Sequence, residues 1–397
     1  MNDALHLPAD GEATPMTIDE GADTALFLLQ QGDQSVHGQG CLRRLPAGPL
    51  QTLEARSRAF FAAQRGGPGV LVGAVPFDPS HDDALHQPVR LAPALAYTDT
   101  PPPALAGDVQ AEPPAQDYAD AVARAVAVLA DATQPLDKVV LARSLRVHTR
   151  QPMPPQALLA RLGKDPSVAT YATPLPTLPG QAPAWLVGAT PELLLRKRGA
   201  QVLSHPLAGS ARRSADATQD AQAAQALLAS RKDHDEHRHV VEAIVDGLAP
   251  WCTRVEAAPR PSLHATASMW HLGTRIHATL KDAATPAATL LAALHPTPAV
   301  CGTPRAPALQ HIGTLEPLPR GFYAGAVGWL DAHGDGDWYV AIRCARLQGP
   351  ELRLYAGAGI VADSQPQAEV AETSAKFSAL LTALGVREAD LPGAQVP

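Results

Sequence analysis

The stretch Leu-Tyr-Ala-Gly-Ala-Gly-Ile-Val-Ala-Asp-Ser-Gln-Pro-Gln-Ala-Glu-Val-Ala-Glu-Thr-Ser-Ala-Lys, residues 354–376, predicts a buried strand followed by a helix. The strand runs into Gly357 and Gly359, whose missing side chains let a ligand approach bare backbone N–H groups. The helix is expected to start near Pro366, because proline is tolerated in a first helical turn. We expect the rest of the chain to be organised around this strand-to-helix unit.

Within the helix, Ser364 is the predicted N-cap, since Gln367 follows it at the spacing of a capping box. Glu369, Glu372 and Lys376 then follow at spacings of three and four and share one helix face. Two carboxylates and a lysine beside exposed backbone suit a divalent cation that bridges to an acidic substrate. A solvated helix end with a Glu–Lys pair is the alternative, and this stretch alone leaves it open.

The composition bounds the class of protein. The chain has 397 residues, 46% hydrophobic and 18% charged, which is enough to bury a large core in one big or two ordinary domains. Its net charge of −7 argues against a nucleic-acid partner. The polar start and the lack of a long apolar run predict a cytoplasmic protein without a membrane segment. The four scattered cysteines indicate buried thiols rather than a disulfide framework or a zinc site.

Composition shifts divide the chain into four parts. Residues 1–20 are expected to be disordered, and 21–98 to be an N-terminal part that packs on the core. The proline content of residues 99–117 predicts a linker or surface loop. Residues 118–390 are expected to form the catalytic region. In the N-terminal part, short apolar runs predict strands, and residues around 50–64 predict a helix. Further along the chain, residues 117–132 predict a helix and residues 138–147 a strand. Two strands are expected within 262–280.

Two charged residues stand out against apolar surroundings. Lys138 is the first residue of a predicted aliphatic strand. A lysine at this position usually marks only the end of the strand and has no chemical role. Glu192 lies between a Thr-Pro turn and the aliphatic run Leu193–Leu195, and such surroundings tend to raise the pKa of a carboxyl and suit it to donate a proton.

A predicted helical segment between 230 and 248 also carries acidic residues. Its apolar stripe, extended backwards at helical spacing, reaches Asp233, Glu236 and His237, so these acids continue the buried face. A buried carboxylate is costly unless a cation pairs with it. The burial of these acids therefore argues against the alternative in which the acidic helix faces are only solvated surface. A zinc site of the zincin type is disfavoured, because no two of the histidines have that spacing around a glutamate.

The remaining motifs occur in the order Ala-Thr-Pro-Glu-Leu-Leu-Leu-Arg-Lys (189–197), His-Pro-Leu-Ala-Gly-Ser-Ala-Arg-Arg (205–213), Lys-Asp-His-Asp-Glu-His (232–237), Trp-His-Leu-Gly-Thr (270–274), Leu-His-Pro-Thr-Pro-Ala-Val-Cys-Gly (294–302), Arg-Gly-Phe-Tyr-Ala-Gly-Ala-Val-Gly-Trp (320–329) and Ala-Ile-Arg-Cys-Ala (341–345). With the stretch 354–376, this series resembles the chorismate-utilising enzyme family, which includes anthranilate, aminodeoxychorismate, isochorismate and salicylate synthases. The resemblance covers residues 118 to 382.

The resemblance implies an α+β fold of large, mainly antiparallel β-sheets flanked by helices, like anthranilate synthase component I, with Mg²⁺ as cofactor. It implies metal ligation by Glu236 and Glu372, with Asp233 and Glu369 reaching the ion or its waters. The implied substrate-binding residues are Gly209, Ser210, His271, Ala299, Tyr323, Arg343, Gly359 and Lys376.

The nucleophile divides this family, and lysine at the position of Lys138 resembles the members that use water. Ala208 stands where aminodeoxychorismate synthases carry a lysine nucleophile, which disfavours that branch, and Ala299 resembles the isochorismate synthases. The resemblance therefore implies a monomeric isomerase that converts chorismate to isochorismate in a siderophore pathway. Lys138 would be the base, kept able to deprotonate by burial away from carboxylates, and Glu192 the acid.

Three other functions remain as alternatives. A salicylate synthase would continue from isochorismate by eliminating pyruvate in the same pocket. A non-catalytic chorismate-binding relic would require a broken set of site residues. A metal-dependent hydrolase built on Asp233 and Glu236 is the third.

Overall fold

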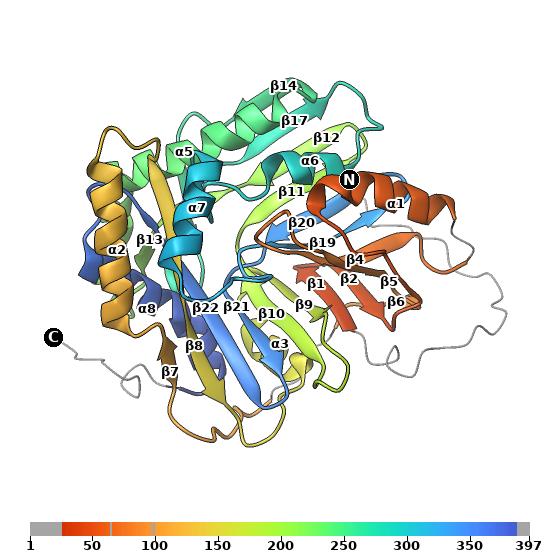
Figure 1. Cartoon of the computed structure of the whole chain (residues 1–397), viewed down its shortest axis with the longest axis horizontal. Coiled ribbons are helices and arrows are strands. Elements are labelled where there is room, and N and C mark those ends of the chain that lie inside the picture. Colours follow the sequence, from red (N-terminus) through yellow and green to blue (C-terminus); the bar gives the residue numbers. More distant parts are fainter. Residues whose placement is uncertain (1–25, 64–65, 96, 98–99, 387–397) are drawn as a thin grey trace.

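The computed structural model describes residues 26–63, 66–95, 97 and 100–386, so the predicted disordered segment 1–20 lies outside the described residues. Two large sheets and one small sheet form the described part, and every pairing between their strands is antiparallel. Helices flank these sheets (Figure 1). The predicted α+β class is confirmed.

The ten-stranded sheet contains the two strands on which the site depends. Its path is β18 (Gly302–Thr303), β8 (Lys138–His148), β22 (Glu351–Ile360), β21 (Cys344–Gln348), β10 (Ala184–Thr190), β9 (Ala169–Leu175), β1 (Leu26–Gln31), β2 (Gln34–Gln39) and β6 (Arg90–Ala92), with β7 (Gln110–Glu112) pairing on β8. Strand β8 is buried almost throughout, which explains its near-continuous aliphatic sequence. Its pairing with β22 places Val140 opposite Gly359, so the start of the stretch 354–376 lies beside Lys138.

The nine-stranded sheet follows the path β14 (Cys252–Ala257), β17 (Ile276–Leu280), β12 (Gln201–His205), β11 (Leu193–Arg198), β20 (Gly336–Val340), β19 (Ala326–Asp331), β4 (Val70–Val75), β5 (Ala84–Gln87) and β3 (Arg43–Arg44). The three-stranded sheet consists of β13 (Leu207–Arg212), β16 (Met269–Gly273) and β15 (Ser262–Ala265). The segment 262–280 therefore forms three strands, and the prediction of two was wrong. A turn at 266–268 separates the first two of them.

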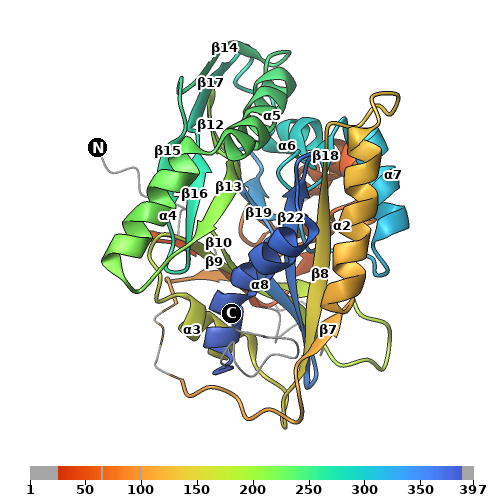
Figure 2. The ribbon, with the colours of Figure 1, turned by 90° about the vertical axis from the view of Figure 1, so that its left-hand side faces the viewer.

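The helices are η1 (Leu50–Thr52), α1 (Leu53–Ala62), α2 (Ala115–Ala130), α3 (Pro155–Leu162), α4 (Ala217–Ala229), α5 (Arg231–Leu248), α6 (Ala287–Leu294), α7 (Arg305–Leu315) and α8 (Pro366–Ala383). Helices α2 and α7 lie along β8 in Figure 1, and Figure 2 shows α8 crossing β22 and β8. Helix α5 packs against β13 and so faces the same region as α8.

Helix α8 starts at Pro366, as predicted, but the predicted cap is wrong. Its N-cap is Gln365, which makes no side-chain cap hydrogen bond. The Ser364 hydroxyl instead accepts from the backbone N–H of Val361 at 3.2 Å, which closes the turn before the helix. Arg143 of β8 links the strand to helix α8, because its Nε donates to the Thr373 hydroxyl at 2.8 Å.

The N-terminal part contributes strands to both large sheets, since β1 pairs with β9 and β4 pairs with β19. The Pro-rich segment contributes β7, which pairs with β8, and its Leu105 bridges to Thr149. One buried apolar cluster runs from the N-terminal strands into the region after residue 118. Among the described residues, the structure has no helix with the length and apolarity needed to cross a bilayer.

Candidate active site

One cavity between α5, α8, β13 and β22 collects the predicted site residues. All of them except Lys138, Asp233 and Glu369 line it, and the remaining lining positions are Val140, Pro191, Leu207, Ala208, Val300, Ala324, Ile342 and Gly357. These residues come from positions as distant in the chain as 140 and 376. The fold therefore brings together groups that the sequence places on separate elements.

Glu192 lies in the turn between β10 and β11, and only 3% of its surface is exposed. Burial raises its pKa to about 8, although the backbone N–H of Leu207 and the nearby Lys138 act in the opposite direction. The carboxyl is therefore largely protonated near neutral pH. A protonated acid that faces a cavity can donate a proton to a bound molecule.

Lys138 is the first residue of β8 and is fully buried. Its Nζ donates to Glu236 Oε1 at 2.9 Å, so the expectation that it lies away from carboxylates was wrong. The sequence could not reveal this contact, because Glu236 comes from α5, far along the chain. A Cβ on Gly359 would overlap both Glu236 Oε1 and Lys138 Cε, so only glycine fits this position of β22.

The acidic groups of α5 and α8 meet at one side of the cavity, each beside a lysine. Glu372 accepts from Lys376 Nζ at 2.5 Å and Glu369 from Lys232 Nζ at 2.8 Å. The Ser210 hydroxyl also donates to Glu372, at 3.3 Å. Lys232 was not among the predicted site residues, although it stands next to Asp233 in the motif 232–237.

The pKa values of these acids are shifted in different directions from their ordinary values. Burial and the neighbouring Glu372 raise the pKa of Glu369. Burial acts on Glu372 too, but Lys376 outweighs it and lowers the pKa of Glu372. Burial raises the pKa of Asp233, and the Ser230 hydroxyl opposes the rise. Repulsion between neighbouring carboxylates disfavours their charged forms, and a bound cation would relieve that repulsion.

Several observations bear on whether these acids fit Mg²⁺. Among the described residues, no three His, Cys, Asp or Glu side chains are close enough to surround an ion. Mg²⁺ is commonly held by only one or two carboxylates, with waters and substrate oxygens completing its shell. Glu236 and Glu372 line the same cavity, and Glu369 Oε2 is buried without a hydrogen-bond partner in the described part. This donor set fits a hard cation shared with a substrate.

Two basic side chains, Arg343 and Lys376, also line the cavity. Arg343 adopts a left-handed backbone with φ of 50°, and its guanidinium has no hydrogen-bond or ion-pair partner among the described residues. Lys376 Nζ donates to Gly357 O at 2.9 Å in addition to its contact with Glu372. An arginine without a protein partner in a cavity is suited to a planar carboxylate from outside.

The remaining predicted residues shape the cavity. His271 Nε2 is buried without a partner in the described structure, and burial holds the pKa of His271 well below its ordinary value, so the ring is neutral. The Tyr323 ring stacks on Tyr355 with centroids 4.8 Å apart. Gly209 has a φ of 79° and passes so close to Asp233 that a Cβ would collide with it. Ala208 and Ala299 add only small apolar groups to the lining.

A model of the family described as "Chorismate binding enzyme" matches residues 84–385 of the chain. The chain belongs to this family. It is 42% identical to isochorismate synthase DhbC of Bacillus subtilis over 347 residues, which cover 85% of this chain and 87% of that protein.

Two solved structures support the fold assignment. The structure of DhbC from Bacillus anthracis matches with a TM-score of 0.86 and 37% identity, covering 92% of this chain and 97% of that one. Anthranilate synthase component I of Streptococcus pneumoniae matches with a TM-score of 0.64 and 20% identity, covering 94% and 95%. The fold is therefore that of anthranilate synthase component I, as the sequence predicted.

Proposed function

We propose that this chorismate-binding enzyme is an isochorismate synthase, which adds water at C2 of chorismate while the C4 hydroxyl leaves. The observation that carries the proposal is that a buried carboxyl with a pKa of about 8 lines the cavity, while a buried lysine lies directly behind the cavity residue Glu236 and acts on the pKa of that carboxyl. The first is a proton donor at neutral pH and the second a candidate base, and the reaction needs one of each. The identity of 42% to an isochorismate synthase supports the same choice.

In this mechanism, Glu192 donates its proton to the departing C4 hydroxyl, and Lys138 accepts a proton from the water that attacks C2. One proton is donated to the leaving hydroxyl, which departs as water, and one is taken from the attacking water, so no net proton is consumed. In the reverse direction the two groups exchange roles. Arg343 and Lys376 bind the substrate carboxylates, which both residues face from the cavity lining. Each proton transfer is worth about a hundred- to ten-thousand-fold in rate.

The contact between Lys138 and Glu236 sets a condition on this mechanism. A carboxylate partner stabilises the ammonium, whereas a base must be a free amine. Glu236 is also a proposed metal ligand, so it would turn from Lys138 to the cation when the site fills. Lys138 would then act as a base only in the loaded enzyme.

We further propose Mg²⁺ as the cofactor, held by Glu236 and Glu372, with Asp233 and Glu369 beside the ion or its waters. When bound, the ion would neutralise the substrate carboxylate and stabilise the charge that develops in it. Without a cation, the acids of α5 and α8 would repel a dianionic substrate.

Product analysis tests the proposal. Purified protein is incubated with chorismate and Mg²⁺, with EDTA in a parallel sample, and the products are separated by liquid chromatography. We expect isochorismate only in the sample with Mg²⁺. Salicylate and pyruvate would instead identify a salicylate synthase, and unchanged chorismate would contradict both functions. The motifs resemble those of siderophore-pathway members, and we propose that pathway for the product; loss of catechol siderophore on deleting the gene would test it.

A further inference from the structure

The edge of β8 opposite β22 is completed by two side chains at the level of the reaction cavity. On this edge β18 pairs with the first two residues of β8, and β7 pairs with residues 144–146. Between them no described strand pairs with this edge. There the Val140 carbonyl accepts from Arg320 Nη2 at 2.7 Å, and the Ala142 N–H donates to Glu316 Oε1 at 2.8 Å. Both side chains come from the segment after α7, the helix that lies along β8 in Figure 1.

Arg320 also contacts a second segment of the cavity wall. Its Nη1 donates to the Val300 carbonyl at 2.6 Å. Val140 and Val300 both line the reaction cavity, whereas Arg320 itself does not. The Val140 N–H donates to the Cys301 carbonyl at 2.8 Å. The guanidinium and this backbone bond therefore join β8 to the segment 295–301 directly behind the cavity wall.

The guanidinium of Arg320 is held in one orientation. Its Nε donates to Glu316 Oε2 at 2.9 Å and its Nη2 to Glu316 Oε1 at 2.5 Å, which makes a bidentate pair. Its Cζ lies 4.2 Å from the centre of the Phe77 ring. Pro317 and Pro319 restrict the backbone between the two partners. A lysine could not make this set of contacts, because an ammonium lacks the planar fork.

We propose that Arg320 is a positioning residue for the isochorismate synthase reaction, an inference that rests on the proposed function. It holds the carbonyls of Val140 and Val300 at one guanidinium. It thereby fixes the strand that carries Lys138 against the segment that carries Ala299. This spacing determines where the proposed base stands relative to the substrate ring. A displacement of about 1 Å at a reacting group can cost about a hundredfold in rate.

A second arginine–carboxylate pair has similar contacts away from the cavity and provides the control. Arg56 donates to the two carboxylate oxygens of Asp83 at 3.1 and 2.5 Å. It also donates to the carbonyls of Pro46 at 2.7 Å and Gly48 at 3.1 Å. None of these four residues lines the reaction cavity. The two pairs are therefore alike in bonding and differ in their link to the cavity wall.

Lysine substitutions at the two arginines test the proposal. Arg320→Lys should lower kcat for isochorismate formation by at least about tenfold but keep KM for chorismate within about threefold, because Arg343 and Lys376 still bind the carboxylates. Arg56→Lys should keep both constants within about threefold, and urea unfolding records the stability loss of each variant. A wild-type kcat in folded Arg320→Lys, or a kcat loss of the same size in both variants, would overturn the inference. A wild-type protein that makes no isochorismate would instead contradict the proposed function.

A milder pair of variants keeps the test decisive if Arg320→Lys does not fold. Glu316→Gln retains the arginine but replaces one of the two oxygens that orient its fork. We expect kcat to fall about three- to tenfold at unchanged KM, which corresponds to the loss of about one hydrogen bond in the transition state. Asp83→Asn makes the same change in the control pair and should keep kcat within about twofold. A folded Glu316→Gln protein with the kcat of the wild type would contradict a positioning role for Arg320.

Discussion

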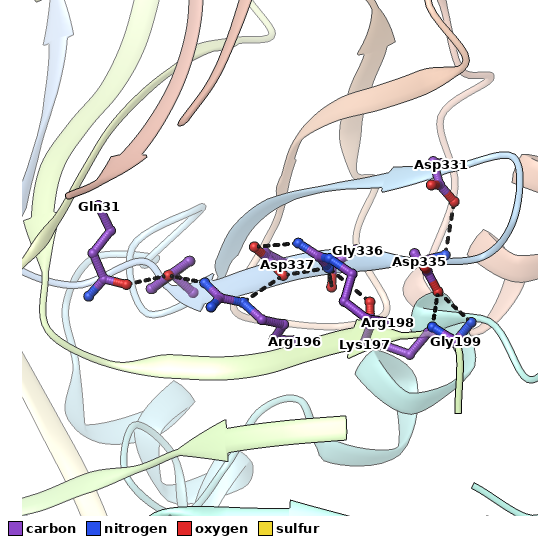
Figure 3. Close-up of polar contacts among 10 residues, drawn as sticks. Gln31, Arg196, Lys197, Arg198, Gly199, Asp331, Asp335, Gly336 and Asp337 are labelled. Atoms are coloured by element: carbon purple, nitrogen blue, oxygen red, sulfur yellow. Dashed lines mark hydrogen bonds and ion pairs between the residues drawn. The ribbon is translucent and has the colours of Figure 1, made fainter. Parts of the chain in front are cut away.

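Two lysines are almost entirely buried, and they lie in different regions. Lys138 starts β8 and donates to Glu236 at 2.9 Å. Lys197 lies near the end of β11 and donates to Asp335 at 2.7 Å (Figure 3). Burial and pairing alone make the two residues equivalent. The surroundings of the two pairs separate a reactive site from a structural one.

Around Lys197 every charge has fixed partners. Asp335 Oδ1 also accepts from the Gly199 N–H at 2.9 Å, and Asp337 is held by Arg196 at 3.1 Å and by Arg198 at 3.0 Å (Figure 3). None of the buried side-chain atoms of this cluster lacks a partner within the described part. Complete pairing of this kind is typical of a cluster that holds strands together.

Around Lys138 the pairing is incomplete. Glu369 Oε2 and His271 Nε2 are buried without partners in the described structure, and the guanidinium of Arg343 contacts no acceptor there. A buried polar group without a partner costs free energy. Proteins keep such groups where a ligand completes their hydrogen bonds. Missing partners, rather than buried charge, therefore distinguish the surroundings of Lys138 from those of Lys197.

The largest expected difference is in turnover. Lys138→Gln should lower kcat by about a hundred- to ten-thousand-fold, because it removes the proposed base while keeping a polar side chain. Lys197→Gln, the matched variant, should leave kcat within about threefold, since Lys197 contacts no cavity residue. Chromatographic assay of isochorismate formation measures both, with circular dichroism as a check on folding. Equal losses in the two variants would mean that the comparison is wrong.

The next effect concerns the cation. Glu372→Gln should raise the Mg²⁺ concentration for half-maximal activity by at least about tenfold, because an amide is a poorer ligand than a carboxylate. Asp335→Asn alters the carboxylate of the structural cluster and should leave the Mg²⁺ titration unchanged. A titration curve for Glu372→Gln that matches the wild type would remove Glu372 from the proposed ligands.

A smaller effect is expected on pH dependence. The raised pKa of Glu192, about 8, means that the proposed acid loses its proton above that pH, so kcat/KM should fall about tenfold per unit there. Stability follows the same group. Between its ordinary pKa and about 8, folded Glu192 keeps a proton that the unfolded chain has lost, so the free energy of unfolding falls as pH rises.

Urea unfolding of Glu192→Gln separates this contribution, because the amide does not titrate. The difference in free energy of unfolding between the variant and the wild type should shift in favour of the variant as the pH rises from 5 to 8. Glu256→Gln changes an exposed glutamate on β14 and should show no such shift. A constant difference for Glu192→Gln would contradict the raised pKa.

The sequence predicted the elements better than their contacts. Period and turn signals located β8, β22, α5 and α8, because these depend on local pattern. The resemblance supplied the members of the cavity, which are distant in the chain. The pair between Lys138 and Glu236 was missed, since no local signal reports which helix face meets which strand. The Ser364 cap failed because its hydroxyl bonds to the preceding turn, an alternative that the capping pattern does not exclude.

The smallest effect tests the structural cluster itself. Asp337→Asn removes the charge that Arg196 and Arg198 share but leaves one carbonyl to accept a hydrogen bond. Because both arginines are partly exposed and water can solvate them, the loss in free energy of unfolding should be only about 1–2 kcal/mol. Urea unfolding measures this loss, and kcat should stay within about threefold. A larger fall in kcat with unchanged stability would show that the cluster acts on the cavity, and charge pairing would then no longer distinguish the two regions.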